Sequence, residues 1–310
     1  MFEYFDAHSH LNLSPLRDQQ EEIIKKMNEL GVGTVTVGTD LETSKLAVEI
    51  AENNSNIWAS VGLHPSEAVV FDVPSVLSRA ESREVERHND KEVFDYKKYL
   101  ELAQHPKVVA IGEAGLDYFR VNSLDVRDNS LLIRKQKEIF LKQIELSVEI
   151  KKPLMIHCRP SAGTMDAYED LYEILVSDIR YPISCMDKDK DRLRGNLHFF
   201  AGNIEITKKF LGLGFTFSFD GPITYPIDPS TKLGASYDEV IKFLPLESMM
   251  AETDAPFAAP VPYRGKTNYP YYVKYVVEKI AEIKGLSFEI VKKALVENAV
   301  RTFSLVVNHR

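Results

Sequence analysis

Histidines and carboxylates recur where short apolar runs of this chain end. The first run ends in Asp6-Ala7-His8-Ser9-His10. Since alternate residues of a strand point to the same side, His8 and His10 can direct two imidazoles at one point. Four later runs are followed by a further histidine or acid, namely His64, Glu113, His157 and Asp254, and His198 lies within another run. One His-x-His pattern is weak alone, but this recurrence indicates a site that binds Zn²⁺ or Mn²⁺, with Fe and Co not excluded.

Carboxylates among these histidines indicate a particular chemistry. A carboxylate can bridge two cations and hold them about 3.5–4 Å apart, so that both oxygens of a displacement are stabilised. Water bound to such cations loses its proton near neutral pH. A second carboxylate beside that water can take or deliver the proton. The residue types therefore predict metal-dependent hydrolysis.

The elements that must position these residues alternate along the chain. Eight apolar runs predict strands: Phe2–Ala7, Gly33–Val37, Ile57–Val61, Val108–Ile111, Leu154–Ile156, Asn196–Phe200, Phe215–Ser218 and Met249–Ala251. Helical spacing separates them, with Gly31 and Gly285 placed to end two helices. Strands alternating with helices predict an α/β fold with a parallel sheet, here a (β/α)₈ TIM barrel. The carboxyl ends of its strands would form the active-site mouth.

No repeat and no Pro/Gly/Ser linker divides the 310 residues, so we expect one domain spanning 1–310. Two charged stretches, at about 66–105 and 183–195, are expected to be excursions from the barrel. Hydrophobic residues make up 44% and charged residues 27%, which is ordinary for a globular protein. Disorder and fibrous repeats are excluded.

The formal net charge is −8, from 38 Lys+Arg against 46 Asp+Glu. An acidic surface repels polyanions at long range, so any nucleic-acid contact must be local or carried by metal. Cys158 and Cys185 are too few for a disulfide framework. The chain start lacks a signal-peptide pattern, and no apolar stretch reaches the roughly 20 residues that span a bilayer. We expect a soluble, cytoplasmic protein with no membrane contact and no obligate protein partner.

Six segments that contain these residues follow one another along the chain: Asp6-Ala7-His8-Ser9-His10, Gly62-Leu63-His64-Pro65, Gly112-Glu113-Ala114-Gly115-Leu116-Asp117-Tyr118, Ile156-His157-Cys158-Arg159, His198-Phe199-Phe200-Ala201-Gly202 and Glu252-Thr253-Asp254-Ala255-Pro256. In this order they resemble the TatD-type deoxyribonuclease family of amidohydrolase-like metal-dependent barrels. That family also has residues related to Gln136, Phe140 and Gly221-Pro222-Ile223-Thr224-Tyr225 at the corresponding places. Because the resemblance covers essentially the whole chain, it is highly specific.

The resemblance implies a centre of two divalent ions, Zn, Mn or Mg. His8 and His10 would bind the first ion, and His157 and His198 the second. Glu113 would bridge both. Family members cleave phosphodiester bonds in DNA, often from the 3′ end, and some are linked to deacylation of D-aminoacyl-tRNA.

Catalytic roles are implied in the same way. Asp254 would sit on the first metal and accept a proton from the nucleophilic water. His64 and Arg159 would line the pocket near the scissile group, and Arg264 and Lys266 are further candidate phosphate contacts. Simpler roles stand beside these: a helix cap for Glu113, a turn for Asp254, indirect support of the site for His64, and a structural ion pair for Arg159. Asp117 is expected to orient a neighbour by hydrogen bonding.

One segment departs from the family pattern. After the eighth strand the chain has Thr267 and Tyr269, where relatives have a basic and an acidic residue, so substrate preference stays open. Tyr269, Tyr271 and Tyr272 could stack on a base, but such clusters are more often packing. The leading function is a phosphodiesterase acting on DNA ends or a small phosphoester. The alternatives are hydrolysis of a C–N or carboxylic-ester bond and a non-enzymatic binding protein.

Overall fold

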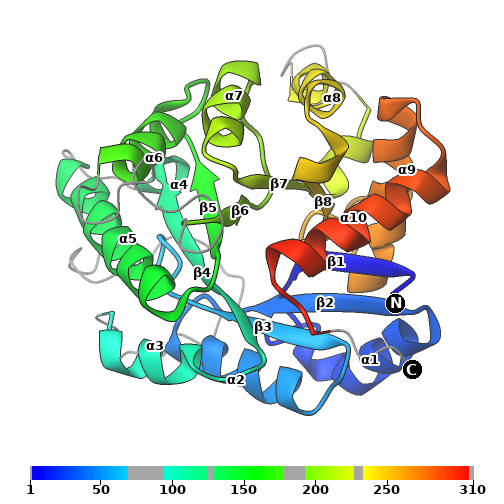
Figure 1. The fold of residues 1–310 in the computed structure, drawn as a ribbon, viewed down its shortest axis with the longest axis horizontal. Coiled ribbons are helices and arrows are strands. Elements are labelled where there is room, and N and C mark those ends of the chain that lie inside the picture. Colours follow the sequence, from blue (N-terminus) through cyan, green and yellow to red (C-terminus); the bar gives the residue numbers. More distant parts are fainter. Residues whose placement is uncertain (1, 69–93, 124–128, 178–192, 227–232, 307–310) are drawn as a thin grey trace.

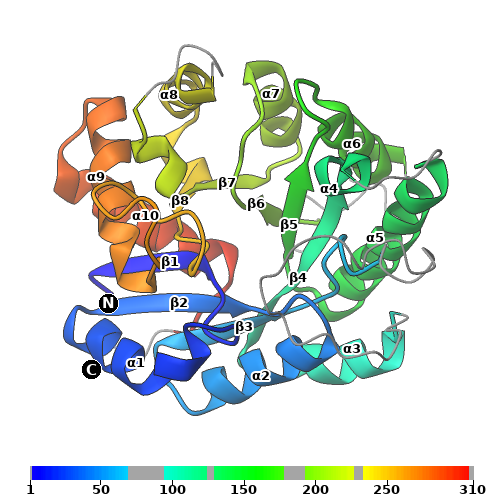
Figure 2. The same ribbon diagram turned by 180° about the vertical axis from the view of Figure 1, so that it is seen from behind.

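The computed structural model describes residues 2–68, 94–123, 129–177, 193–226 and 233–306. Eight parallel strands form one sheet in chain order, with helices around it (Figures 1 and 2). The strands are β1 Tyr4–Ser9, β2 Val32–Val37, β3 Ile57–Val61, β4 Val108–Asp117, β5 Leu154–Arg159, β6 Gly195–Leu197, β7 Thr216–Phe219 and β8 Met249–Ala251. The predicted (β/α)₈ barrel is confirmed.

The barrel closes between β1 and the segment that follows β8. Ser9 and Ala255 form a parallel bridge. Backbone hydrogen bonds run from His10 N to Ala255 O at 2.7 Å and from Asp254 N to His8 O at 2.9 Å. The first and last strands therefore meet at their carboxyl ends, where the predicted ligands His8, His10 and Asp254 lie.

Helices follow the strands and cover the outside of the barrel. They are α1 Gln20–Glu29, α2 Leu41–Glu52, α3 Tyr96–Ala103, α4 Tyr118–Asn122, α5 Ser130–Ile150, α6 Asp166–Ser177, α7 Ile204–Gly212, α8 Leu233–Phe243, α9 Val273–Lys284 and α10 Phe288–Thr302, with short 3₁₀ turns η1 Arg17–Gln19, η3 Gly221–Thr224, η4 Leu246–Ser248 and η5 Pro270–Tyr272. Gly31 and Gly285 have φ of 66° and 64°, as expected for the helix ends they were predicted to form.

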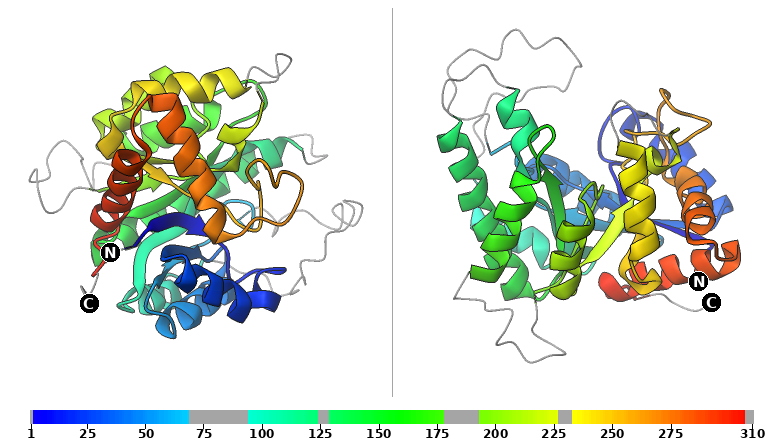
Figure 3. Two further views of the ribbon diagram at one scale, coloured as in Figure 1. Left: turned by 90° about the vertical axis from the view of Figure 1, so that its right-hand side faces the viewer. Right: turned by 90° about the horizontal axis from the view of Figure 1, so that it is seen from above.

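The strands are buried on both faces, which is why they read as apolar runs. One core lies between the strands and the outer helices. A second core includes Phe5, Trp58 and Met155 from the strands and Phe303, next to the end of α10. In the right-hand view of Figure 3, α10 in red lies at one end of the barrel and the orange segment after β8 lies at the other. The amino ends of the strands are thus plugged, and the predicted site lies at the opposite end.

The bounds of six of the eight strands differ from the prediction, and β4 and β6 are two of these strands. β4 continues to Asp117, so Glu113 lies within this strand and not after it. The register with β5 shifts between Ile111 and Ala114, and a Cβ on Gly112 would lie 2.2 Å from Met155 O. Glycine is required at this irregularity because it lets the two backbones approach. β6 ends at Leu197, so His198 follows the strand.

The predicted excursions lie partly outside the described residues. Residues 69–93 and 178–192 are not described. Within 66–105, Tyr96–Ala103 forms α3, and within 183–195, Gly195 begins β6. Among the helices of the described residues, none has both the length and the apolar character needed to span a membrane.

Candidate metal centre

Glu113 lies at the centre of the histidine cluster, 3% exposed. Its Oε1 is 2.7 Å from His157 Nδ1 and 2.8 Å from His198 Nε2. Its Oε2 faces the other pair, 3.6 Å from His8 Nε2 and 3.8 Å from His10 Nε2. One carboxylate oxygen therefore faces each pair of imidazoles.

The ring nitrogens within each pair are also close. His8 Nε2 and His10 Nε2 are 3.1 Å apart, and His157 Nδ1 and His198 Nε2 are 3.3 Å apart. Asp254 Oδ1 adds an oxygen to the first pair, 3.3 Å from His10 Nε2 and 3.7 Å from His8 Nε2. Two nitrogens and at least one carboxylate oxygen converge on each side of Glu113, a donor set that suits divalent transition metals.

These candidate ligand side chains come from elements that share one end of the barrel. His8 is in β1 and His10 follows it, His157 is in β5, and His198 and Asp254 follow β6 and β8. The structure thus brings together all six residues predicted to bind metal.

Hydrogen bonds to neighbouring groups fix the imidazole orientations. His10 Nδ1 is 2.8 Å from Val37 O, and His157 Nε2 is 3.2 Å from Asp117 Oδ2. Asp117 also accepts a hydrogen bond from Arg120 N at 2.8 Å, at the start of α4. Partners of this kind set the tautomer of a ligating histidine and raise its basicity. They leave His10 Nε2 and His157 Nδ1 directed at the centre.

The carboxylates and imidazoles of the cluster shift one another's pKa values. Burial alone would raise the pKa of Glu113, but the imidazoles of His64, His198 and His157 outweigh it and hold that pKa well below 4.5. Burial opposes the charge on His198, yet Glu113 and Glu252 raise its pKa well above 6.5. For His8, burial and the neighbouring imidazoles lower the pKa well below 6.5. Glu113 is thus an anionic carboxylate surrounded by imidazoles, and a cation bound between them could contact both kinds of group.

His64 lies beside the second pair. Its Nε2 is 3.4 Å from Glu113 Oε1, and its ring centroid is 4.4 Å from that of His157. Nδ1 is 2.6 Å from Ser66 Oγ. Burial lowers the pKa of His64 to about 4, so the imidazole is neutral at pH 7 and can donate or accept a hydrogen bond.

The three basic side chains predicted to contact substrate lie outside the cluster. Arg159 is exposed at the end of β5, with its guanidinium carbon 4.0 Å from the ring centroid of Phe119. The guanidinium of Arg264 is 4.3 Å from the ring centroid of Tyr225, and Lys266 is exposed.

Tyrosines of the departing segment pack on one another. Tyr269 stacks on Tyr271 with ring centroids 5.2 Å apart, and Tyr272 stands edge-on to both. Thr267 is only partly buried. This geometry matches the packing interpretation of the tyrosines.

Three acids received no role from the sequence alone. Glu252 Oε1 is 3.6 Å from His198 Nδ1, while its oxygens accept hydrogen bonds from Phe199 N and Ser218 Oγ. Asp6 accepts hydrogen bonds from Thr253 N at 2.8 Å and Thr253 Oγ1 at 2.6 Å, which joins β1 to the end of β8. Glu252 and Asp6 lie within two residues of a predicted ligand, and this proximity in the sequence could have identified them as part of the site.

The third acid, Asp220, is 1% exposed directly after β7. Its Oδ2 has no hydrogen-bond partner among the described residues. Burial, with the charges of Glu252 and Asp254, raises the pKa of Asp220 well above 3.8. No pattern in the sequence distinguished this acid from one in a surface turn.

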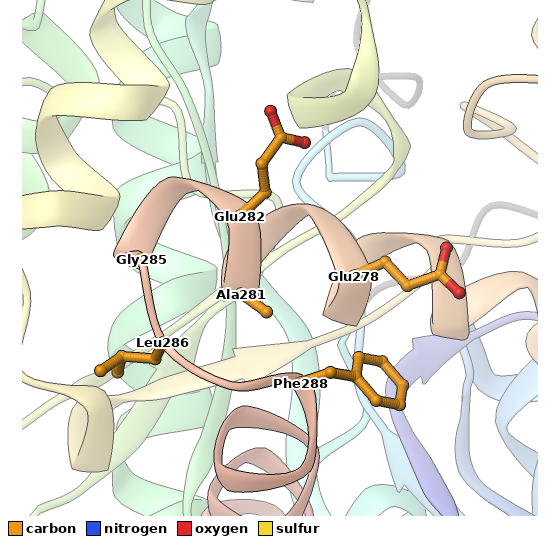
Figure 4. Close-up of a pocket in the computed structure, with 6 residues that line it drawn as sticks. All are labelled: Glu278, Ala281, Glu282, Gly285, Leu286 and Phe288. Atoms are coloured by element: carbon orange, nitrogen blue, oxygen red, sulfur yellow. The ribbon is translucent and has the colours of Figure 1, made fainter.

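A separate hollow of about 410 Å³ lies where α9 meets α10 (Figure 4). Its lining is Glu278, Ala281, Glu282, Gly285, Leu286 and Phe288. Phe288 contacts Tyr4, the first residue of β1, with ring centroids 6.4 Å apart. The hollow is therefore near the amino end of a strand, away from the histidines, and holds none of the predicted site residues.

A parallel (β/α)₈ barrel with buried histidines and carboxylates clustered at the strand carboxyl ends defines the class of metal-dependent hydrolase barrels. Similarity to known proteins agrees with this class. The chain belongs to the TatD family: the family model described as "TatD related DNase" matches residues 5–304.

Relatives match almost end to end. The chain is 35% identical over 303 residues to the uncharacterized metal-dependent hydrolase YabD of Bacillus subtilis, covering 97% of this chain and 99% of that protein. It is 29% identical over 303 residues to the uncharacterized metal-dependent hydrolase TatD of Mycobacterium tuberculosis, covering 97% of each. The crystal structure of YJJV, a TatD homolog from Escherichia coli, superposes with a TM-score of 0.72 at 24% identity, covering 98% of this chain and 99% of that one. The protein is thus a metal-dependent hydrolase of the TatD family.

Proposed function

We propose that this protein is a two-metal phosphodiesterase that cleaves DNA at single-stranded or frayed ends. The observation that carries the proposal is the position of Glu113, whose two carboxylate oxygens each face one pair of histidines. A carboxylate placed in this way suits two cations held side by side. The family description as a DNase is the second support.

Six side chains would hold the ions. His8, His10 and Asp254 form one group and His157 and His198 the other, with Glu113 common to both. Bound divalent ions would supply an acidified water and Lewis-acid polarisation of the phosphoryl group. We propose that these ions are Zn²⁺, Mn²⁺ or Mg²⁺.

The protein side chains have separate tasks. Asp254 is 9% exposed, so its carboxylate can reach solvent and accept the proton of the attacking water. Neutral His64, beside the second group, would hydrogen-bond to the scissile phosphate or the leaving oxygen. Exposed Arg159, Arg264 and Lys266 are proposed to contact neighbouring phosphates.

DNA must be bound through local contacts, because the chain carries a formal net charge of −8. Long-range attraction of DNA is therefore weak, and binding should depend on the ions and on a few basic groups. A short end presents few phosphates to an acidic surface, which favours ends over long duplex. Within the same proposal we place the protein in the cytoplasm, since buried Cys158 is a free thiol, as in proteins of reducing compartments.

A substrate panel tests the proposal. Purified protein is assayed with Mg²⁺, Mn²⁺ or Zn²⁺ on single-stranded and duplex oligonucleotides labelled at the 5′ or 3′ end, and on amide, lactone and ester substrates. We expect turnover of the oligonucleotides, fastest on single strands, and loss of turnover in Glu113→Ala. Turnover of carbon esters or amides with intact oligonucleotides would instead assign C–N or carboxylic-ester hydrolysis.

A further inference from the structure

Two large aromatic side chains are exposed on opposite sides of the barrel mouth. Phe257, after β8, is 53% exposed, and Phe119, in α4 directly after β4, is 41% exposed. Because the strands follow one another in the order β1 to β8, β4 and β8 face each other across the barrel. The histidine cluster lies between these two strand ends. Each ring would gain burial if a flat apolar group covered it.

Phe257 is held beside the first pair of histidines. Its ring centroid is 6.1 Å from that of His10, with the ring planes at 69°. Its N–H donates to Asp254 O at 2.8 Å, and its carbonyl accepts from Asn268 Nδ2 at 2.7 Å. Asn268 is fully buried and also donates to Thr253 O at 2.7 Å. The backbone that carries this ring is therefore fixed, and a ligand stacking on it orders little further chain.

Phe119 is placed in the same way beside the second pair. Asp117, two residues before it, contacts His157 Nε2 at 3.2 Å. Arg159, two residues after His157 on β5, lies over the Phe119 ring at 4.0 Å from its centroid. An exposed ring and an exposed guanidinium thus adjoin one another at the edge of the centre. Together they match the base and the phosphate of one nucleotide.

A single-stranded nucleic acid offers alternating phosphates and flat bases. With one phosphodiester at the histidine cluster, the nucleotides on its two sides extend toward opposite parts of the mouth. We propose that Phe257 and Phe119 each stack on one of the two nucleobases that flank the scissile phosphodiester; this inference rests on the proposed function. Duplex bases are already stacked on one another, so these rings favour single strands and frayed ends. Stacking of this kind tolerates any base sequence.

The test compares Phe257→Ala and Phe119→Ala with a matched control, Phe243→Ala. Phe243 is also exposed, at 42%, with Lys208 Nζ 5.7 Å from its ring centroid. It is the last residue of α8. Helices of such a barrel run opposite to the strands, so this residue lies away from the mouth. The substrates are a single-stranded oligonucleotide and the same oligonucleotide with abasic nucleotides on both sides of the cleaved bond.

We expect each mouth variant to lower kcat/KM on the normal oligonucleotide by about 5-fold to 150-fold, the loss of one stacked base. On the abasic substrate the same variants should match wild type, and Phe257→Trp should restore cleavage of the normal substrate. Phe243→Ala should match wild type on both, and metal content should be the same in all variants. Equal losses on both substrates, or no loss on either, would overturn the inference.

Binding of a fluorescent, non-hydrolysable oligonucleotide to the metal-loaded protein separates this inference from the proposed function. If wild type binds but cleaves no phosphodiester, the proposed function is wrong, and weaker binding in Phe257→Ala still supports the stacking role. If wild type cleaves and Phe257→Ala binds and cleaves equally well, the stacking role alone is wrong. If wild type neither binds nor cleaves the oligonucleotide, both are wrong.

Discussion

Replacing Glu113 with glutamine in the metal-free protein should destabilise the fold in a pH-dependent way. The substitution keeps the shape of the side chain and removes its charge. Glu113 Oε1 is 2.7 Å from His157 Nδ1 and 2.8 Å from His198 Nε2, and both imidazoles have raised pKa values. Removing one partner of a buried ion pair typically costs about 3–5 kcal/mol when the other partner stays charged.

The sign follows from the direction of each pKa shift. His157 and His198 have pKa values above 6.5 in the folded state, so their stabilisation is complete below pH 6.5 and is lost as the pH rises through the raised values. Glu113 has its pKa below 4.5, so its stabilisation is present above pH 4.5 and is lost as the pH falls through the lowered value. The pairs therefore contribute most between pH 4.5 and 6.5. We expect Glu113→Gln to lower the free energy of unfolding by about 3–5 kcal/mol at pH 5.5, and by less at pH 9.

Urea unfolding of chelator-dialysed protein, followed by circular dichroism at pH 5.5, 7 and 9, measures this effect. Glu138→Gln is the control, because Glu138 is 62% exposed on α5 and pairs with Arg134 at 3.7 Å. Surface pairs contribute little, so the control should change stability slightly and equally at each pH. The same loss at every pH in Glu113→Gln, or no loss at pH 5.5, would refute the electrostatic account of the cluster.

Three further predictions concern the metal centre. Asp254→Asn should lower kcat by about 10²- to 10⁴-fold, the contribution of a general base, while metal analysis still finds the ion at His157 and His198; an unchanged kcat would remove Asp254 from proton transfer. Asp117→Asn should weaken metal binding by about 10- to 100-fold, because His157 loses the carboxylate that orients it; metal titration against a competing chelator measures this, and an affinity equal to wild type would contradict it. Dialysis against a chelator should abolish turnover and lower the melting temperature, and metal at about 100 times its Kd should restore about 2.7 kcal/mol per site; calorimetry checks this, and equal melting temperatures with and without metal would count against a bound ion.

The sequence was most informative where periodicity is simple. The alternation in Asp6-Ala7-His8-Ser9-His10 predicted two imidazoles on one side of a strand, and the structure has their Nε2 atoms 3.1 Å apart. Eight apolar runs were enough to predict the barrel, because strands that are buried on both faces consist almost entirely of apolar residues. Once the barrel was predicted, residues at the strand ends had to converge.

Features that depend on contacts between distant residues were not predictable. Glu113 was expected after its strand, but glycines at 112 and 115 let β4 continue irregularly beside β5 to Asp117. The contact of Glu252 with His198 depends on how β6 and β8 pack through Ser218 of β7. The position of Arg159 over Phe119 is a rotamer choice that no spacing specifies.

The closure of the barrel has a consequence for how the protein must assemble. Thr253 and Asp6, 247 positions apart, are joined by two hydrogen bonds, and Asp254 and His10 meet beside them. An N-terminal fragment that stops before β8 would carry five of the six candidate ligands yet would have an open edge on β1. A nascent chain therefore completes its set of candidate metal ligands only after its last strand docks. An ion bound there would link the two ends of the chain.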